Sequence, residues 1–147
     1  MSRASTTAAA RGFIRESTIG VAAATPNELI RRIEQGLPMR ALESLALGLG
    51  MGLPEVAGHV GIPARTLARR KTAGRLSPEE SERVVRVARL FEKAVALFDG
   101  DGDGARQWMH QPKQALAGQR PIDYARTEIG AREVENLLGR IEHGVFS

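Results

Sequence analysis

The side chains best suited to chemistry in this sequence are basic and hydroxyl groups clustered just after position 64. They recur at helical spacing, so one face of a short helix can present most of them together. Arginine can hydrogen-bond to guanine edges in the major groove of DNA, and lysine can neutralise phosphate. The residues that we expect to contact DNA are Arg65, Thr66, Arg69, Arg70, Lys71 and Arg75.

Two short helices joined by a tight turn would position this basic face. Val56 and Val60 lie four residues apart, on one face of a first helix. Gly61 can adopt the positive φ that the turn requires, and Leu67 can anchor the second helix in a core. The window therefore predicts a helix-turn-helix, although Arg70 lies where such units often bury an apolar residue. The alternative is a basic surface helix in an unrelated bundle.

The composition favours a helical protein in a reducing compartment. Of the 147 residues 42% are hydrophobic, enough for a core, and only 4% are aromatic. The absence of cysteine excludes disulfides and any thiolate nucleophile or metal ligand. No stretch approaches the roughly 20 apolar residues that a membrane-spanning helix needs. We expect an all-α protein in the cytoplasm, with no membrane partner.

The charge is divided unevenly along the chain. Residues 1–75 contain 11 Lys and Arg against 5 Asp and Glu, a net charge of +6, whereas residues 76–147 contain 10 against 12, a net of −2. The basic half holds the predicted helix-turn-helix, so motif and charge indicate the same polyanionic partner. The acidic half is expected to bind a different one.

Composition and helix signals divide the chain into three parts. Residues 1–25, rich in Ala, Ser and Thr, are expected to form a flexible arm. Residues 26–76 form the helix-turn-helix domain, and residues 77–147 hold a long linking helix and a small C-terminal domain. Thr25 caps the first helix. The predicted apolar face of that helix comprises Leu29, Ile30 and Ile33.

The linking helix has the clearest start. Ser77 and Glu80 can form a capping box, and an apolar stripe about 20 residues long follows. The stripe consists of Val84, Val87, Ala88, Phe91, Val95 and Phe98. It either packs within the chain or forms a dimer surface, and the sequence leaves both open. A final helix is expected over residues 131–143, with Gly144 at its end.

Catalytic and metal-binding patterns are weak. The run from Asp99 to Gly104 resembles the start of a calcium loop, but His110 occupies the position of the required glutamate. A helix cap at Asp103 plus a turn explains these residues. No histidine pair has metal-ligand spacing, and no nucleophile has a nearby base. We expect a non-enzyme without a metal or cofactor.

The chain resembles the Xre/MbcA/ParS-type antitoxins, which are partners of RES-domain toxins. The resemblance covers roughly residues 27–147 and is clearest over residues 61–70 and 76–83. Two positions depart from the family pattern, Pro63 before the second helix of the motif and Lys113 after Pro112. The further matching positions include Trp108, Met109, Ala115, Leu116, Gly118, Pro121, Thr127, Gly130, Val134 and residues 141–146.

The resemblance implies an antitoxin with two functions. The N-terminal Xre-like helix-turn-helix would bind the promoter of its own operon and repress transcription. The C-terminal domain would bind a RES toxin that consumes NAD⁺ and cover the approach to the toxin's active site. The residues expected to contact the toxin are Trp108, Arg132, Arg140, His143, Gly144, Val145 and Phe146.

Helix-turn-helix proteins usually act as dimers, so a homodimer within the toxin–antitoxin complex is expected. The alternative function is a stand-alone dimeric repressor whose C-terminal domain only dimerises or senses a ligand.

Overall fold

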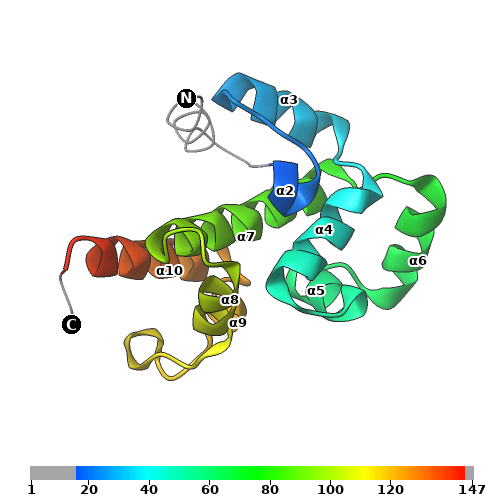
Figure 1. The fold of residues 1–147 in the computed structure, drawn as a ribbon. Coiled ribbons are helices and arrows are strands. Elements are labelled where there is room, and N and C mark those ends of the chain that lie inside the picture. Colours follow the sequence, from blue (N-terminus) through cyan, green and yellow to red (C-terminus); the bar gives the residue numbers. More distant parts are fainter. Residues whose placement is uncertain (1–15, 145–147) are drawn as a thin grey trace.

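The computed structural model describes residues 16–144, and the regular structure within them is helical (Figure 1). The expected all-α fold is therefore confirmed. In chain order the elements are α2 (Glu16–Ile19), α3 (Pro26–Gln35), α4 (Met39–Leu49), α5 (Leu53–His59), α6 (Ala64–Ala73), α7 (Pro78–Leu97), α8 (Gly102–His110), the 3₁₀ turn η1 (Gln114–Leu116), α9 (Pro121–Tyr124) and α10 (Glu128–Glu142).

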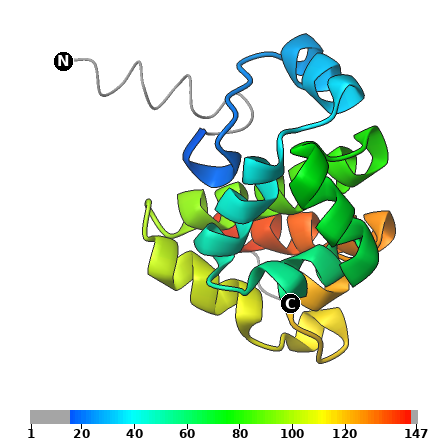
Figure 2. The same ribbon diagram turned by 90° about the vertical axis from the view of Figure 1, so that its right-hand side faces the viewer.

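The long helix α7 is the centre of the fold, because α3, α4, α8 and α10 all pack against it (Figures 1 and 2). The predicted capping box starts it. Ser77 Oγ accepts from the Glu80 N–H at 3.1 Å, and Glu80 Oε1 accepts from the Ser77 N–H at 2.9 Å. The predicted apolar stripe is buried from Val84 to Phe91. Intramolecular packing therefore accounts for the stripe.

The segment before α3 belongs to the core. Helix α2 packs against α4, and Ile19 and Val21 are buried. The flexible arm expected over residues 1–25 is therefore wrong for residues 16–25, whose apolar side chains have a helical surface to dock on. The rest of that expected arm lies outside the described residues.

Helix α3 starts as predicted but exposes part of its apolar face. Thr25 Oγ1 accepts from the Glu28 N–H at 3.2 Å, while the Glu28 carboxylate accepts from the Ala24 N–H at 2.9 Å. Leu29 is buried, whereas Ile30, expected in the core, is 51% exposed. The physical reason is that α3 packs mainly against α7, which covers only one side of it.

Hydrogen bonds between distant segments close the N-terminal unit. The Met39 N–H donates to the Gly74 carbonyl at 2.9 Å, and the Leu76 N–H donates to the Leu37 carbonyl at 2.8 Å. The buried Ser81 hydroxyl on α7 accepts from the Leu37 N–H at 2.8 Å. The C-terminal end of α6 is thus joined to the segment before α4.

The C-terminal unit lies along the second half of α7. Helix α10 begins at Glu128, three residues before its predicted start, because Thr127 Oγ1 caps it by accepting from the Gly130 N–H at 3.0 Å. A Cβ on Gly130 would lie 1.7 Å from the Tyr124 carbonyl oxygen. Only glycine therefore allows the end of α9 to lie so close to α10.

Candidate functional site

Helices α5 and α6 form the predicted helix-turn-helix. Val56, Val60 and Leu67 are buried, and Gly61 adopts a φ of +71°, so the expected packing and turn are confirmed. Arg83 of α7 donates from Nε to the Val60 carbonyl at 2.6 Å. Helix α7 therefore fixes the turn that orients α6.

Helix α6 presents a basic face at the edge of the molecule (Figure 1). Arg65, Arg69 and Lys71 are exposed, and Thr66 is half-buried and accepts from Arg69 Nη2 at 3.3 Å. Within residues 16–144 none of these three cations forms an ion pair. Their charge is therefore available to a polyanion. We call these four residues the α6 basic face.

Arg70 does not belong to this face, although the sequence suggested it. Its Nε donates to Glu80 Oε1 at 2.7 Å and its Nη2 donates to Glu80 Oε2 at 3.0 Å. Burial opposes ionisation of Glu80, but the hydrogen bonds from Arg70 and Ser77 outweigh it and lower the pKa of the carboxyl. Arg70 thus supplies the counter-charge for a buried acid at the start of α7.

Arg75 is also engaged within the chain. Its Nη1 donates to the Gly36 carbonyl, and its backbone bridges that of Pro38. The side chain remains exposed, but its guanidinium joins the end of α3 to the segment after α6. Among the predicted DNA-contacting residues, Arg70 and Arg75 are therefore engaged in intramolecular contacts.

The residues expected to contact a toxin are not all brought together. Trp108 is buried and lies beneath Lys113, whose Nζ is 5.0 Å from the ring centroid, so it is a core residue. Burial lowers the pKa of Lys113. Arg132 is exposed and lies 3.8 Å from a Glu128 carboxylate oxygen. Arg140 is half-buried.

The end of α10 is accessible. His143 and Gly144 are exposed, and Gly144 has a φ of +74°, as predicted for a helix end. Val145 and Phe146 lie outside the described residues. Arg132, Arg140, His143 and Gly144 thus remain the surface candidates on this helix.

A polar network that the sequence did not reveal joins the two units. His59 of α5 contacts the Glu55 carbonyl oxygen through Nδ1 at 2.9 Å and Asp123 Oδ1 through Nε2 at 2.8 Å. Arg126 Nη2 also lies 3.4 Å from the same Nε2 atom, so the imidazole contacts both an acid and a base of the C-terminal unit. Asp123 also accepts from Arg120, at 2.7 and 3.0 Å. These bonds from Arg120 and His59 lower the pKa of Asp123 to about 2.

A second set of contacts connects α8 to the end of α4. Arg106 donates to the Gly48 carbonyl at 2.9 Å, and His110 Nε2 lies 2.9 Å from the Leu49 carbonyl oxygen. Both carbonyls belong to the last turn of α4, where no later helical N–H can reach them. Side chains of the C-terminal unit therefore complete a helix of the N-terminal one.

The acidic run after α7 forms a helix cap. Asp101, rather than the predicted Asp103, caps α8, because its Oδ1 accepts from the Asp103 N–H at 3.1 Å. Among the described residues no group of three or more His, Cys, Asp or Glu side chains could hold a metal ion. No helix of the described chain is long and apolar enough to cross a membrane.

Comparisons with known proteins match both units. The model of the antitoxin Xre-like helix-turn-helix domain matches residues 28–89, and that of the antitoxin Xre/MbcA/ParS C-terminal toxin-binding domain matches residues 93–144. An antitoxin Xre of Yersinia enterocolitica is 42% identical to the chain, and an antitoxin Xre of Photorhabdus laumondii is 35% identical, each over 88% of both proteins. A Prs ADP-ribosylating antitoxin of a Sphingobium species is 27% identical over 84% of both.

The two matched segments meet within α7, so the central helix contributes to both units. The α6 basic face lies in the first segment, and the exposed end of α10 lies in the second. From its two domains and its relatives, the chain belongs to the Xre/MbcA/ParS family of antitoxins and combines a DNA-binding helix-turn-helix with a toxin-binding domain.

Proposed function

We propose that this antitoxin neutralises a RES-family toxin that consumes NAD⁺, by covering the approach to the toxin's active site. In this proposal the accessible end of α10, with Arg140, His143 and the residues after it, makes the contact together with Arg132, which lies nearer the start of the same helix. The name of the Sphingobium relative, which refers to ADP-ribosylation, is compatible with a partner that uses NAD⁺. The antitoxin itself supplies binding surface and performs no catalysis.

We further propose that the α6 basic face binds the promoter of the antitoxin's own operon and represses it in the cytoplasm. Two copies would act as a homodimer on paired half-sites, as helix-turn-helix proteins commonly do. The observation that carries the proposal is the placement of the two surfaces. The basic helix α6 and the end of α10 lie at opposite ends of the molecule, so one chain can bind both partners (Figure 1).

The test is co-expression of the full chain with the product of the adjacent gene, followed by mass determination of the purified complex. A stable complex with a RES-type protein, whose NAD⁺ consumption falls to background, is the expected result. Removing residues 144–147 should impair toxin binding and leave operator binding unchanged. Failure of the full chain to bind the toxin would contradict the proposal. Neutralisation by the truncated chain equal to that by the full chain would show that residues 144–147 are not needed for toxin binding.

Arg69→Ala separates the two activities. The variant should weaken operator binding by about 1–3 kcal/mol, the usual worth of a base contact, and should neutralise the toxin as well as the wild type does. Glu133→Gln, an exposed change on α10, is a control for operator binding. Release of toxicity by Arg69→Ala with intact operator binding would contradict the division of labour proposed here.

A further inference from the structure

The end of α3 is attached to the turn that follows α6. Gly36, the residue after α3, has a φ of +84°, and a Cβ there would lie 2.3 Å from the Leu76 carbonyl oxygen. Arg75 Nη1 donates to the Gly36 carbonyl, and the Met39 N–H donates to the Gly74 carbonyl at 2.9 Å. These contacts hold α3 in a fixed position beside the C-terminal end of α6.

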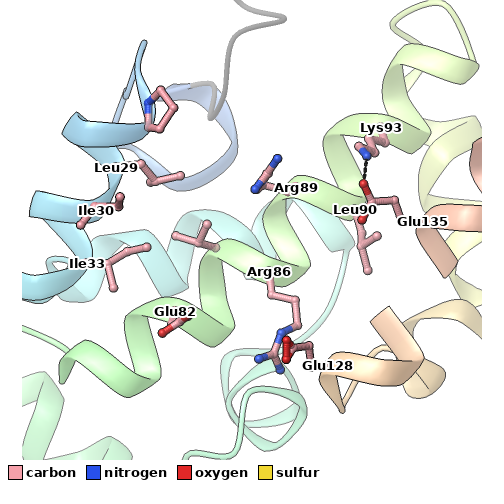
Figure 3. Close-up of a pocket in the computed structure, with 12 residues that line it drawn as sticks. Leu29, Ile30, Ile33, Glu82, Arg86, Arg89, Leu90, Lys93, Glu128 and Glu135 are labelled. Carbon is pink, nitrogen blue, oxygen red and sulfur yellow. Dashed lines mark hydrogen bonds and ion pairs between the residues drawn. The ribbon is translucent and has the colours of Figure 1, made fainter. Parts of the chain in front are cut away.

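Two arginines of α3 lie outside the groove between α3, α7 and α10. The apolar side chains of α3 line that groove, whereas neither Arg31 nor Arg32 does (Figure 3). Position 32 lies four residues before Gly36 and therefore on nearly the same side of the helix. A Cβ on Gly36 would lie 3.3 Å from Arg75 Cγ. Arg32 thus lies one helical turn from the point where α3 meets Arg75.

These three arginines form a cationic surface that the chain itself does not neutralise. Their side chains are exposed, and within residues 16–144 none of them forms an ion pair, even with the two acids of α3, Glu28 and Glu34. Arg75 Nη1 is held by the Gly36 carbonyl, but a guanidinium has five N–H donors, so others remain for a ligand. We call Arg31, Arg32 and Arg75 the α3–α6 junction.

The dimensions of α6 and of the major groove determine what this surface would meet on DNA. Helix α6 has 10 residues and is therefore about 15 Å long. The major groove is only about 12 Å wide. When α6 lies in the groove, its C-terminal end thus reaches the sugar–phosphate backbone at the rim. The α3–α6 junction adjoins that end and would meet phosphates rather than base edges.

We propose that the α3–α6 junction is a second DNA-binding surface, which binds phosphates of the strand that borders the groove occupied by α6. Guanidinium groups neutralise phosphate oxygens and hydrogen-bond to them, and such contacts fix the register of a protein on the duplex without reading its sequence. Because α3 is fixed to the end of α6, these contacts would set how α6 enters the groove. The assignment rests on the proposed function of the α6 basic face and adds an element outside the helix-turn-helix.

Arg32→Ala in the full chain is the principal test. Fluorescence anisotropy titrations compare a duplex that carries the promoter of its own operon with a scrambled duplex of the same length, over a series of salt concentrations. Affinity for both duplexes should fall by the same factor, about fivefold or more near 0.1 M salt, because one phosphate contact and its counterion release are lost. The slope of log K against log salt should become shallower by about 1. Adding Arg31→Ala should extend both effects.

Arg40→Ala is the matched control, since it removes the same charge from another exposed arginine. Arg40 Nη2 donates to the Gly20 carbonyl at 3.4 Å, so this side chain faces the segment after α2, which lies on the other side of α4 from α6 (Figure 1). The change should alter both affinities by less than about twofold, because charges beyond the Debye length are screened. Circular dichroism checks that both variants keep their helices.

The outcomes separate this assignment from the function proposed for α6. Unchanged affinity and salt slope with Arg32→Ala, while Arg69→Ala weakens operator binding, would overturn the second surface and leave the α6 basic face in place. Equal weakening by Arg40→Ala and Arg32→Ala would also overturn it, since net charge alone would then explain the effect. Loss of affinity for the promoter duplex only would show that Arg32 reads bases, against the phosphate assignment. A wild-type chain that binds neither duplex would contradict both proposals.

Discussion

The imidazole Nε2 of His59 lies 2.8 Å from Asp123 Oδ1, although 64 positions separate the two residues. His59 is the last residue of α5, which packs against α6, and Asp123 lies in α9 of the toxin-binding domain. The contact joins the two domains directly, in addition to their shared helix α7. The orientation of the DNA-reading unit thus depends on groups in the other domain.

Asp123→Ala should destabilise the chain by about 2 kcal/mol. The change removes the carboxylate that pairs with Arg120 and contacts the buried His59, and breaking a paired, partly buried group costs more than losing a surface pair. Urea denaturation followed by circular dichroism measures the loss.

Asp99→Asn, at an exposed carboxylate, is the control and should change stability by less than about 0.5 kcal/mol. A double-mutant cycle with His59→Gln should show coupling between positions 59 and 123. Strictly additive effects would mean that the hydrogen bond contributes nothing to stability.

The same carboxylate should give the chain an acid-sensitive component of stability. The pKa of Asp123 is about 2 in the folded chain against an ordinary value of 3.8, so folding favours the ionised form. The resulting stabilisation is complete above pH 4 and is lost as the pH falls from about 4 to 2. With partial exposure of the carboxylate taken into account, it amounts to about 1–2 kcal/mol.

Urea denaturation of the wild type and of Asp123→Asn at several pH values between 2 and 5 measures this component. The difference in unfolding free energy between the two proteins should shrink as the pH falls through this window. A difference that stays constant with pH would rule out Asp123 as the source.

Arg69 and Arg70 are neighbours with opposite expected phenotypes. Arg69→Ala should weaken operator binding without changing stability, because its side chain is exposed. Arg70→Ala should lower stability, because it leaves the carboxylate of Glu80, which is 6% exposed, without its counter-charge.

Operator titrations combined with urea denaturation of both variants test this contrast. Combining Arg70→Ala with Glu80→Gln should recover part of the stability, since the amide oxygen can still accept from the Ser77 N–H while the buried charge is removed. An Arg70→Ala chain that is as stable as the wild type but fails to bind DNA would show that Arg70 belongs to the α6 basic face.

Gly130→Ala should be severely destabilising, by about 3 kcal/mol or more, because the new methyl group would lie 1.7 Å from the Tyr124 carbonyl oxygen. The matched control is Gly139→Ala on the same helix, where a Cβ meets nothing within 4 Å. Alanine there should raise stability by about 0.5–1 kcal/mol through its higher helix propensity. Thermal denaturation of both variants compares them, and similar melting temperatures would contradict the close crossing.

Several elements could be predicted from the sequence because their signals are local. The capping box of Ser77 and Glu80 fixed the start of α7, and the spacing of Val56, Val60 and Leu67 indicated the helix-turn-helix core. Apolar periodicity within one helix shows which side will be buried, since it depends only on residues a few positions apart. The prediction that Ile30 is buried was wrong, because periodicity identifies the apolar face of a helix but not how much of that face a neighbouring helix will cover.

The resemblance to the antitoxin family also came from the sequence, and the matches of both domains support it. The sequence could list the cations of the α6 region but could not say which of them are occupied within the chain. The sequence does not distinguish Arg65 from Arg70, but in the structure Arg70 neutralises the buried carboxylate of Glu80.

Tertiary structure alone decided which charged and polar side chains far apart in the sequence become partners. Arg70 meets Glu80 because α7 returns past α6, Trp108 is buried because α8 packs on α7, and His59 meets Asp123 because α9 lies beside the end of α5. Helical faces follow from local spacing, whereas an ion pair requires two groups to meet within a few ångströms. That distance is set only when distant segments of the chain pack together.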